Sequence, residues 1–473
     1  MSNTEPAIRA YQFNRSRRIY LETLGCAKNR VDTEIMITAL LGTGYELTAD
    51  PAQAQVIIVN TCAFLTAATE EGIARLLDLS DYKSGGVCEK LVCAGCLSER
   101  YREDLLKEVP EIDGLLGSSN FQEIPALLDE LYAAGEEGAG EAGEAGARSA
   151  GQVVRLLPKP HYAHYETHSR VLTTPGAYAY LKIAEGCSNM CSFCNIPFLR
   201  GYFSSRKIES VVGEARELIA AGVREINIIS QDISSYGADF RDGTRLAHLL
   251  RALDNLEGDY WLRLFYAYPN TFGEEEMEAL AGGRHLAPYL DMPFQHISAR
   301  VLQDMNRRIT GREIRGRVTR LKELLPRLAL RTTFIVGFPT ETEEDFAELL
   351  EFVREGWFEH VGVFAYSHED NIRSARLGDP VPARVKRQRR KALLEAQQEI
   401  ASARNAARVG QVFRVLVEGP SAETDLLLQG RAEFQGPEVD GVVYINEGTA
   451  QSGQFNQVEI TDSNVYDLIG RIV

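Results

Sequence analysis

The sequence predicts an α/β protein with three folded parts: an N-terminal parallel α/β domain, a partial TIM-like (β/α) barrel and a small antiparallel, OB-like β-barrel at the C-terminus. Its 473 residues are enough for about three domains, each with a core of its own. Short β-rich runs alternate with amphipathic helical patterns over most of the chain, which is typical of βαβ units and parallel sheets. The last part changes to strand-like alternation between Gly, Pro and Asn, which is typical of a small barrel.

Composition limits the classes of protein to consider. Hydrophobic residues make up 44% and charged residues 25%, the mixture of an ordinary globular protein rather than of a disordered or fibrous one. No stretch reaches the ~18 apolar residues of a membrane span, and the polar start lacks the apolar core of a signal peptide, so we expect a cytoplasmic protein without a membrane partner. The net charge of −16 disfavours nonspecific binding to nucleic acid.

In the N-terminal domain, expected over residues 1–132, strand-like and helix-like segments alternate. The predicted strands are residues 19–23, 56–60, 90–94 and 114–116, and the predicted helices are residues 31–41, 67–79 and 98–109. Residues 133–151 consist almost entirely of Ala, Gly and Glu and cannot pack a core, so we interpret them as a solvated linker or a long surface loop. Linker and connector together are expected to occupy residues 133–166.

The second domain, expected over residues 167–408, repeats a strand–helix pattern six times, which suits a partial (β/α) barrel. The predicted strands are residues 178–184, 225–229, 261–265, 289–292, 332–336 and 360–364, with helices that include residues 210–221, 245–256 and 343–354. A long helical stretch follows over residues 383–409, with a basic run made of Arg384, Lys386, Arg387, Arg389, Arg390 and Lys391. Such a run is typical of a solvated helix face, and a contact with nucleic acid is the alternative.

The C-terminal domain, expected over residues 409–473, is acidic. Its predicted strands are residues 412–418, 425–431, 442–446 and 457–461. It contains three basic residues, Arg414, Arg431 and Arg471, and ten acidic ones, which gives a net charge of −7. A domain that cradles RNA is expected to be basic, whereas an acidic one suits a basic protein partner. Alternatively, the acidic charge serves only solubility.

Three cysteines directly after the first strand of the second domain carry the clearest chemical signal. Cys187, Cys191 and Cys194 stand at C-x3-C-x2-C spacing, close enough to bind one corner each of a cubane iron–sulfur cluster. Because only three ligands are supplied, the fourth iron is free to bind an amino-carboxylate ligand such as S-adenosylmethionine. The alternatives are zinc, which would need a fourth protein ligand, and buried cysteines without a cofactor.

This spacing resembles the signature of the radical S-adenosylmethionine superfamily. The resemblance implies a cluster that passes one electron to the bound sulfonium and releases a 5′-deoxyadenosyl radical, which abstracts hydrogen from an unactivated carbon. Phe193 would shield that cluster. Gly337, in the run Ile-Val-Gly-Phe-Pro at residues 335–339, resembles the superfamily's late-strand motif near the adenine, although Thr340 stands where the related pattern has Gly.

A second set of cysteines lies near the ends of predicted strands in the N-terminal domain: Cys26, Cys62 and Cys96. Parallel strands bring their C-terminal ends to one edge of a sheet, so three distant thiols can converge there on a second three-ligand cluster. The alternative for each is an ordinary small core residue. Cys93 forms a C-x-x-C pair with Cys96 but alternates in phase with the strand, so we expect a buried strand residue; we expect no cofactor role for Cys88.

Two cysteine trios followed by a terminal barrel resemble the methylthiotransferase family over nearly the whole chain. That family joins an N-terminal cluster domain, a radical S-adenosylmethionine barrel and a TRAM-type domain, and it inserts a methylthio group at a C–H bond. The chain is similar to the branch that modifies an aspartate β-carbon of small-subunit ribosomal protein twelve, rather than to the branch that acts on a tRNA adenosine. The segments that carry this likeness are TLGCAKNRVD at 23–32, AEGC at 184–187, IPFLRG at 196–201 and YAYP at 266–269.

The resemblance implies two [4Fe–4S] clusters and two uses of S-adenosyl-L-methionine, one as radical source and one as methyl donor to a sulfur on the N-terminal cluster. It also implies two partners, an electron donor and the ribosomal protein within its subunit. A tRNA methylthiotransferase, with the basic helix as its contact surface, is the nearest alternative. A non-catalytic iron–sulfur sensor or RNA-binding protein is the alternative from another class.

Further candidate residues lie at predicted strand ends around the barrel mouth. Gln231, Asp232, Gln295 and His296 stand where they could hold the cofactor or the substrate, and a structural role for each is the alternative. Arg200 is a candidate to contact a carboxylate, with an exposed or interface arginine as the alternative. Sequence alone assigns no catalytic acid or base.

Overall fold

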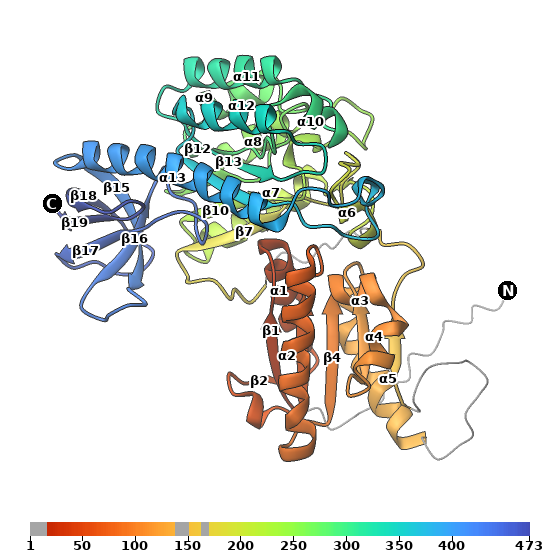
Figure 1. Cartoon of the computed structure of the whole chain (residues 1–473). Coiled ribbons are helices and arrows are strands. Elements are labelled where there is room, and N and C mark those ends of the chain that lie inside the picture. The colour runs from red at the N-terminus through yellow and green to blue at the C-terminus, as the bar shows by residue number, and fades with distance from the viewer. Residues whose placement is uncertain (1–16, 138–150, 162–169) are drawn as a thin grey trace. The chain divides into compact units, whose positions relative to one another are not determined.

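The structure is a computed structural model that describes residues 17–137, 151–161 and 170–473 (Figure 1). The chain divides into two compact units, one of residues 1–63 and 67–158 and the other of residues 64–66 and 159–473. Each unit has a parallel sheet of its own, as the sequence predicts. Among the described residues, no helix combines the length and the apolar character needed to cross a membrane.

The first unit is a six-stranded parallel sheet in the order β2-β1-β3-β4-β5-β6. Its strands are β1 (Arg18–Thr23), β2 (Glu46–Leu47), β3 (Val56–Thr61), β4 (Lys90–Gly95), β5 (Gly114–Gly117) and β6 (Val153–Arg155). Its helices are α1 (Ala27–Gly42), α2 (Thr66–Gly85), α3 (Cys96–Tyr101), α4 (Glu103–Glu108) and α5 (Ile124–Glu137). Every residue of β3 is buried, as expected for a central parallel strand covered on both faces.

Three local features of this unit differ from expectation. The helix predicted over residues 98–109 is two short helices, because Arg102 between them has a φ of 50° and cannot continue a right-handed helix. Residues 133–137 of the expected linker are the last turn of α5, which fits the strong helix propensity of Ala and Glu. Val153–Arg155, in the expected connector, pairs with β5. Residues 138–150 and 162–166 of the expected linker and connector lie outside the described residues.

The second unit contains another six-stranded parallel sheet, in the order β14-β13-β12-β11-β10-β7. Its strands are β7 (Tyr178–Lys182), β10 (Glu225–Ile229), β11 (Trp261–Leu264), β12 (Leu286–Asp291), β13 (Ala329–Val336) and β14 (His360–Ala365). The short strands β8 (Ala184–Glu185) and β9 (Ser204–Ser205) form a separate pair. The sheet does not close on itself, so the partial barrel predicted from six strand–helix repeats is confirmed.

Helices follow the strands of this partial barrel and pack on its outer face (Figure 1). They are α6 (Ile196–Leu199), α7 (Ile208–Ala220), α8 (Leu246–Asp254), α9 (Glu274–Gly282), α10 (Ala299–Asp304), α11 (Gly311–Leu324) and α12 (Glu343–Arg354). One continuous apolar core joins both layers; it includes Leu264 and Phe334 from strands and Leu249 and Phe352 from helices, all fully buried.

The long helix α13 (Ala383–Arg408) leads from the partial barrel to a closed five-stranded barrel. Its strands are β15 (Val412–Pro420), β16 (Leu428–Ala432), β17 (Val443–Glu447), β18 (Phe455–Ser463) and β19 (Leu468–Ile472). The expectation of an entirely antiparallel barrel was wrong in one pair, because β17 and β19 run parallel and close the barrel. The sequence pattern shows strands but not which of them become neighbours.

Buried ion pairs join the small barrel to the partial barrel. Arg431 of β16 lies 2.8 Å from a carboxylate oxygen of Glu225 on β10, and Arg263 of β11 lies 2.7 Å from the other oxygen. All three side chains are 1% exposed or less. Such pairs hold two surfaces in one register because a lone buried charge is costly.

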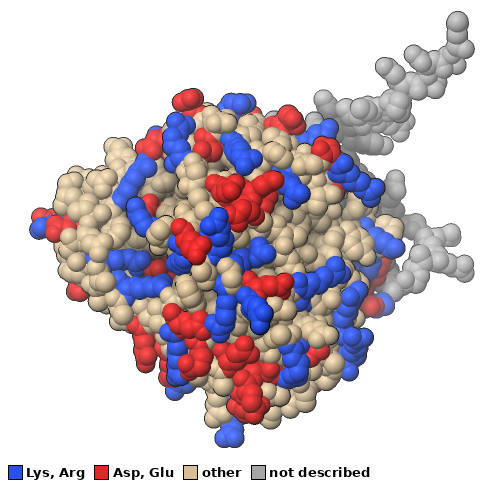
Figure 2. Space-filling view, turned by 90° about the horizontal axis from the view of Figure 1, so that it is seen from above, with Lys and Arg blue, Asp and Glu red and all other residues tan. Residues whose placement is uncertain are grey.

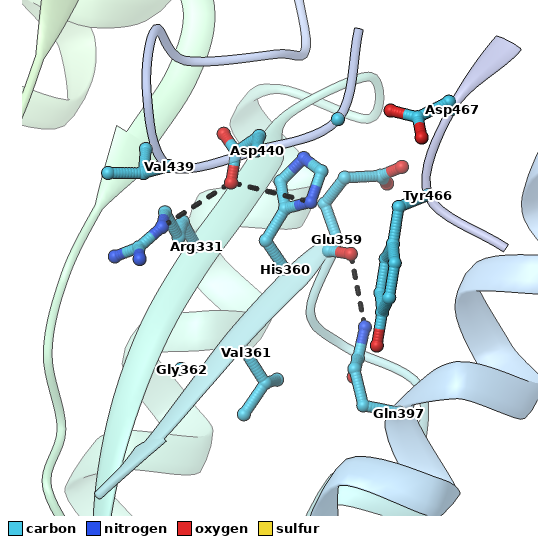
Figure 3. A pocket seen from close by; sticks show the side chains of 11 residues that line it. Arg331, Glu359, His360, Val361, Gly362, Gln397, Val439, Asp440, Tyr466 and Asp467 are labelled. Carbon is cyan, nitrogen blue, oxygen red and sulfur yellow. Dashed lines mark hydrogen bonds and ion pairs between the residues drawn. The ribbon is translucent and has the colours of Figure 1, made fainter.

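A pocket of about 370 Å³ lies at the same junction, at the N-terminal ends of β13 and β14 (Figure 3). Asp440 of the small barrel points between Arg331 and His360, at 3.4 and 3.5 Å. Gln397 of α13 donates to the backbone carbonyl of Glu359 at 3.0 Å. This pocket is at the opposite strand ends from the Cys187–Cys194 loop, so it is not where the predicted chemistry resides.

Candidate functional site

The loop of Cys187, Cys191 and Cys194 follows β7 and β8 and folds back on the chain at both ends. The amide of Cys187 donates to the carbonyl of Gly201 at 3.1 Å, and the amide of Cys194 donates to the carbonyl of Cys191 at 3.1 Å. Gly186 begins the turn with a φ of +77°, and a Cβ there would lie 2.3 Å from the carbonyl oxygen of Tyr202. Only glycine fits this close approach.

A second segment, Asp304–Arg307, holds the same loop from the other side. Ser192 donates its amide to the carbonyl of Met305 at 2.9 Å and its hydroxyl to the carbonyl of Asp304 at 2.7 Å. Asn306 donates its side-chain amide to the carbonyl of Met190 at 2.8 Å. Hydrogen bonds within the protein therefore hold the loop on this side.

The three barrel thiols are close enough to influence one another electrostatically. Burial, with smaller contributions from the charges of Asp232 and Cys191, raises the pKa of the Cys187 thiol to about 12. Burial also raises the pKa of Cys194, with added contributions from Cys191 and Cys187. Clustered, buried thiols of this kind stay protonated alone and ionise readily only when bound to a metal centre.

The Cys187, Cys191 and Cys194 thiols are the candidate ligands for a cubane cluster. Among the described residues, no group of three His, Cys, Asp or Glu side chains is arranged to hold a single metal ion. A cubane instead takes one thiolate at each of several separate iron corners. Phe193 is half-buried against the apolar cluster that contains Phe338 and Tyr366, so one side of the loop is shielded from water.

Gln231 and Asp232 lie at the end of β10, beside the cysteine loop. Asp232 is buried and accepts hydrogen bonds from Asn189, at 2.7 Å, and from the amide of Ser234, at 2.9 Å. The same Asn189 amide lies 3.4 Å from the Cys187 sulfur, so Asp232 orients a donor to that thiol. Gln231 donates to Glu185, while its own carbonyl oxygen is buried with no hydrogen-bond partner among the described residues.

Arg200 contacts a carboxylate of its own chain. It is 2% exposed, and Nη1 lies 3.4 Å from Oε2 of Glu185, which Lys182 also contacts at 2.8 Å. This buried group of charges at the end of β7 was missed from the sequence. The available signal was Lys182 itself, a lysine at the end of an otherwise uncharged strand. Every residue of that strand is buried, and a buried lysine needs a partner.

Gln295, after β12, has a φ of 73° and pairs with β13 through its own backbone. Its amide donates to Thr333 at 2.8 Å, its carbonyl accepts from Ile335 at 2.8 Å, and its side-chain oxygen is buried without a hydrogen-bond partner among the described residues. A non-glycine residue in this conformation is a strained backbone position, of the kind that collects at functional sites.

His296 and Gly337 belong to a shared buried network around Glu341. Gly337 has a φ of +70° and donates its amide to Glu341 at 2.7 Å, and a Cβ on it would lie 2.4 Å from Cγ of Lys386. His296 is fully buried, accepts from the amide of Ser298 at 3.0 Å, and lies 3.6 Å from Glu341. The structure thus ties both residues to protein neighbours at the barrel mouth.

The N-terminal cysteines follow the ends of three adjacent strands: Cys62 and Cys96 by one residue, and Cys26 by three. Thr23 of β1 pairs with Asn60 of β3, and Thr61 of β3 pairs with Gly95 of β4, so the chain leaves all three strands at nearly one level. A Cβ built on Gly25 would lie 2.8 Å from Cβ of Cys62, which places the Cys26 loop against that cysteine. The register therefore brings Cys26, Cys62 and Cys96 to one sheet edge.

Amide side chains hold these loops together. Asn29, in the first turn of α1, donates to the side chain of Asn60 at 3.1 Å and to the carbonyl of Thr61 at 2.9 Å. The Cys26 sulfur lies 3.3 Å from the side-chain oxygen of Asn29. Cys26 is exposed, Cys62 is half-buried and Cys96 is buried, so the trio has an open side.

The remaining two cysteines lie apart from this edge. Cys93 is fully buried within β4, where burial raises its pKa to about 11 while hydrogen bonds to Ser98 and Thr61 partly oppose that effect. Burial likewise raises the pKa of Cys88 to about 11. Both thiols are therefore protonated at neutral pH, which suits packing rather than redox exchange.

Two residues of the basic run on α13 are buried and bonded to other parts of the protein. Lys386 is buried and donates to the carbonyl of Tyr366 at 2.9 Å, and Arg389 is buried between Glu341 and Glu343, both at 2.6 Å. Arg384 and Arg387 are exposed. Figure 2 shows acidic and basic side chains interspersed over the face that it displays, without one continuous basic expanse there.

Family models match all three folded parts of the chain. Residues 18–117 match the Uncharacterized protein family UPF0004, residues 181–353 the Radical SAM superfamily, and residues 409–473 the TRAM domain. Among solved structures, the radical S-adenosylmethionine methyltransferase TsrM from Kitasatospora setae, with cobalamin and a [4Fe-4S] cluster bound, is similar at a TM-score of 0.55 and 17% identity over 76% of this chain and 77% of that one. At this identity the likeness shows the fold alone.

Curated relatives match nearly the full length. A protein of Syntrophotalea carbinolica named "Ribosomal protein uS12 methylthiotransferase RimO" is 48% identical over 97% of each chain. Proteins of the same name from Geobacter sulfurreducens and Bdellovibrio bacteriovorus are 44% and 43% identical, each over 97% of this chain and 99% and 98% of theirs. The chain belongs to this RimO family of radical S-adenosylmethionine methylthiotransferases.

Proposed function

We propose that this protein transfers a methylthio group to the β-carbon of an aspartate in small-subunit ribosomal protein uS12. The observation that carries the proposal is identity of 48% with a curated uS12 methylthiotransferase over 97% of both chains. The two cysteine trios and the acidic C-terminal domain support it. Because ribosomes are cytoplasmic, the same proposal assigns the enzyme to the cytoplasm.

We assign Cys187, Cys191 and Cys194 as ligands of one [4Fe–4S] cluster. When bound, this cluster and S-adenosylmethionine supply the radical that opens an unactivated C–H bond, which no side-chain base could deprotonate at a useful rate. The chain's part is to hold and shield: Asn189 orients the Cys187 sulfur, and Phe193 packs over the loop. Gln231 and Gln295, whose buried amide oxygens lack hydrogen-bond partners among the described residues, are assigned to the amino or hydroxyl groups of the cofactor.

Asp232 and Gly337, also expected to bind the cofactor, are assigned narrower roles. The Asp232 carboxylate already accepts from Asn189 and Ser234, so it positions the loop rather than touching the cofactor. The Gly337 amide already donates to Glu341, so glycine is needed for the turn between β13 and α12.

We assign Cys26, Cys62 and Cys96 to hold the second cluster, which would supply the sulfur of the methylthio group. Their open side suits a sulfur exposed to a reacting partner. The proposal also requires an external one-electron donor, because the radical chemistry would consume an electron.

The alternative substrate is a tRNA adenosine. The net charge of −7 over residues 409–473 opposes it, since phosphate contacts supply much of the affinity for RNA. The internal pairing of Lys386 and Arg389 removes two charges from the basic run that would contact RNA. Four residues of the run stay exposed and would be available to a tRNA enzyme: Arg384, Arg387, Arg390 and Lys391.

The deciding experiment offers both substrates to one enzyme preparation. Anaerobically reconstituted protein is incubated with S-adenosylmethionine and a reductant, together with either small ribosomal subunits or tRNA, and the products are weighed by mass spectrometry. We expect a methylthio mass gain on one aspartate of uS12 and none on RNA. A gain confined to tRNA would refute the ribosomal substrate, and absence of 5′-deoxyadenosine release would favour the non-catalytic sensor.

A further inference from the structure

Arg307 is a buried cation directly beside the barrel cysteines. It is 6% exposed, and its Nη1 donates to the Cys191 sulfur at 3.7 Å. Its Nη2 donates to the backbone carbonyl of Pro293, and the guanidinium carbon lies 4.3 Å from the centroid of the Tyr268 ring. Three different contacts therefore fix both the position and the plane of the guanidinium.

Arg307 makes no direct ion pair with a described residue, although the buried carboxylate of Asp232 interacts with its charge at longer range. No carboxylate of the described residues lies within ion-pair distance of it, and its neighbours are a ring face, a carbonyl and a thiol. In a low-dielectric site, a cation favours any added negative charge directly beside it.

The three barrel cysteines receive different donors. Cys187 accepts from the neutral amide of Asn189, whereas Cys191 accepts from the charged guanidinium of Arg307. Hydrogen bonds from charged donors are roughly twice as strong as those between neutral groups. Hydrogen bonds to cluster sulfurs are among the factors that set the reduction potential of an iron–sulfur cluster.

We propose that Arg307 is a positioning residue that eases one-electron reduction of the barrel cluster by donating a charged hydrogen bond to the Cys191 thiolate. This inference rests on the cluster assignment made under the proposed function. In the step concerned, one electron passes from an external low-potential one-electron donor to [4Fe–4S]²⁺ and gives [4Fe–4S]⁺. No proton moves and no covalent bond changes, and Arg307 stays protonated throughout.

The test measures the reduction potential of that cluster alone. A Cys26→Ala background removes the N-terminal cluster, so that the electron paramagnetic resonance signal followed in a potentiometric titration with dithionite comes from the barrel cluster. We expect Arg307→Gln to bind the electron about tenfold more weakly, a midpoint lower by about 59 mV. Iron content should stay unchanged. The matched control is Arg308→Gln, one residue on and exposed, with the midpoint of the parent protein.

Each remaining outcome is decisive. An unchanged midpoint in Arg307→Gln with full iron content would overturn the proposal. Should Arg307→Gln fail to bind iron, Arg307→Lys keeps the charge, and a midpoint equal to that of the parent would support the proposal whereas a tenfold loss would refute it. A Cys26→Ala protein with no cluster at all would overturn the ligand assignment itself, and the inference with it.

Discussion

At the residue scale, the mouth of the partial barrel is organised around one buried carboxylate. Glu185 is 2% exposed and contacts Lys182 at 2.8 Å and Arg200 at 3.4 Å, with Gln231 as a further donor. Burial by itself would raise the pKa of Glu185, but the charges of Lys182 and Arg200 overcome it and hold the pKa at about 2. The group joins the strand end to the loop that follows the cysteines.

Glu185→Gln should therefore destabilise the protein by about 3–5 kcal/mol at pH 7, because it removes one partner of a buried ion pair. The folded-state pKa is below the ordinary value of 4.5, so this stabilisation is complete above pH 4.5 and is lost as pH falls towards 2. Denaturant unfolding followed by circular dichroism at several pH values measures both effects. Glu257→Gln, at an exposed loop position, is the control, and equal losses in the two variants would contradict the prediction.

The ligand assignments make a second prediction at this scale. Cys187→Ala and Cys26→Ala should each lose about half of the iron and sulfide of the reconstituted protein, because each removes a ligand from a different cluster. Cys93→Ala should keep all of it, since Cys93 is a fully buried strand residue bonded to Ser98 and Thr61. Full iron content in both ligand variants would refute the assignment.

At the element scale, strand register decides what the N-terminal cysteines can do. Gly95 ends β4 with a φ of +90°, and a Cβ there would lie 2.4 Å from the side-chain oxygen of Asn60 and 2.8 Å from the carbonyl of Thr61. Gly95 therefore lies too close to the end of the neighbouring strand β3 for any side chain at residue 95, immediately before Cys96.

Gly95→Ala should displace Cys96 and selectively reduce binding of the N-terminal cluster. We expect about half of the iron to be lost, with the barrel cluster still detected by its spectral response to S-adenosylmethionine. Gly42→Ala, at the end of α1 with open space around it, is the matched control and should keep the full content. Unchanged iron content in Gly95→Ala would show that the close approach of Gly95 to β3 does not position Cys96.

At the scale of the whole molecule, the small C-terminal barrel is fastened to the partial barrel by buried charges. Arg431 pairs with both Glu225 and Glu418, and the neighbouring Arg263 shares Glu225. On the outside of the same small barrel, Arg471 pairs with Glu459 but is 47% exposed, so water screens that pair.

Arg431→Ala should cost about 3–5 kcal/mol of stability, because Glu225 loses one of its two buried partners. Arg471→Ala, the surface control, should cost about 0–1 kcal/mol. Thermal unfolding measures the difference, and limited proteolysis should release fragments of residues 409–473 from Arg431→Ala first. Equal proteolysis of the two variants would mean that the buried pair does not fasten the small barrel.

Much of the architecture was predictable because it depends on local pattern. The strands of both parallel sheets follow from the alternation of apolar runs with helical patterns. The exceptions are the two-residue β2 and the three-residue β6 of the first sheet, which are too short to show a pattern. The closing strand β19 was missed for a related reason: Leu468–Ile472 alternates, but only its neighbours β17 and β18 show that it completes a barrel.

The sequence by itself determined the six candidate cysteines and the resemblance that they support, because one trio has a short characteristic spacing and the other follows the ends of predicted strands. Only the tertiary structure decided which other groups meet them. Arg307 comes to Cys191 across 116 residues, and Glu225 meets Arg431 across 206. Such contacts depend on strand order and register, which are fixed by packing over the whole core and leave no local trace in the chain.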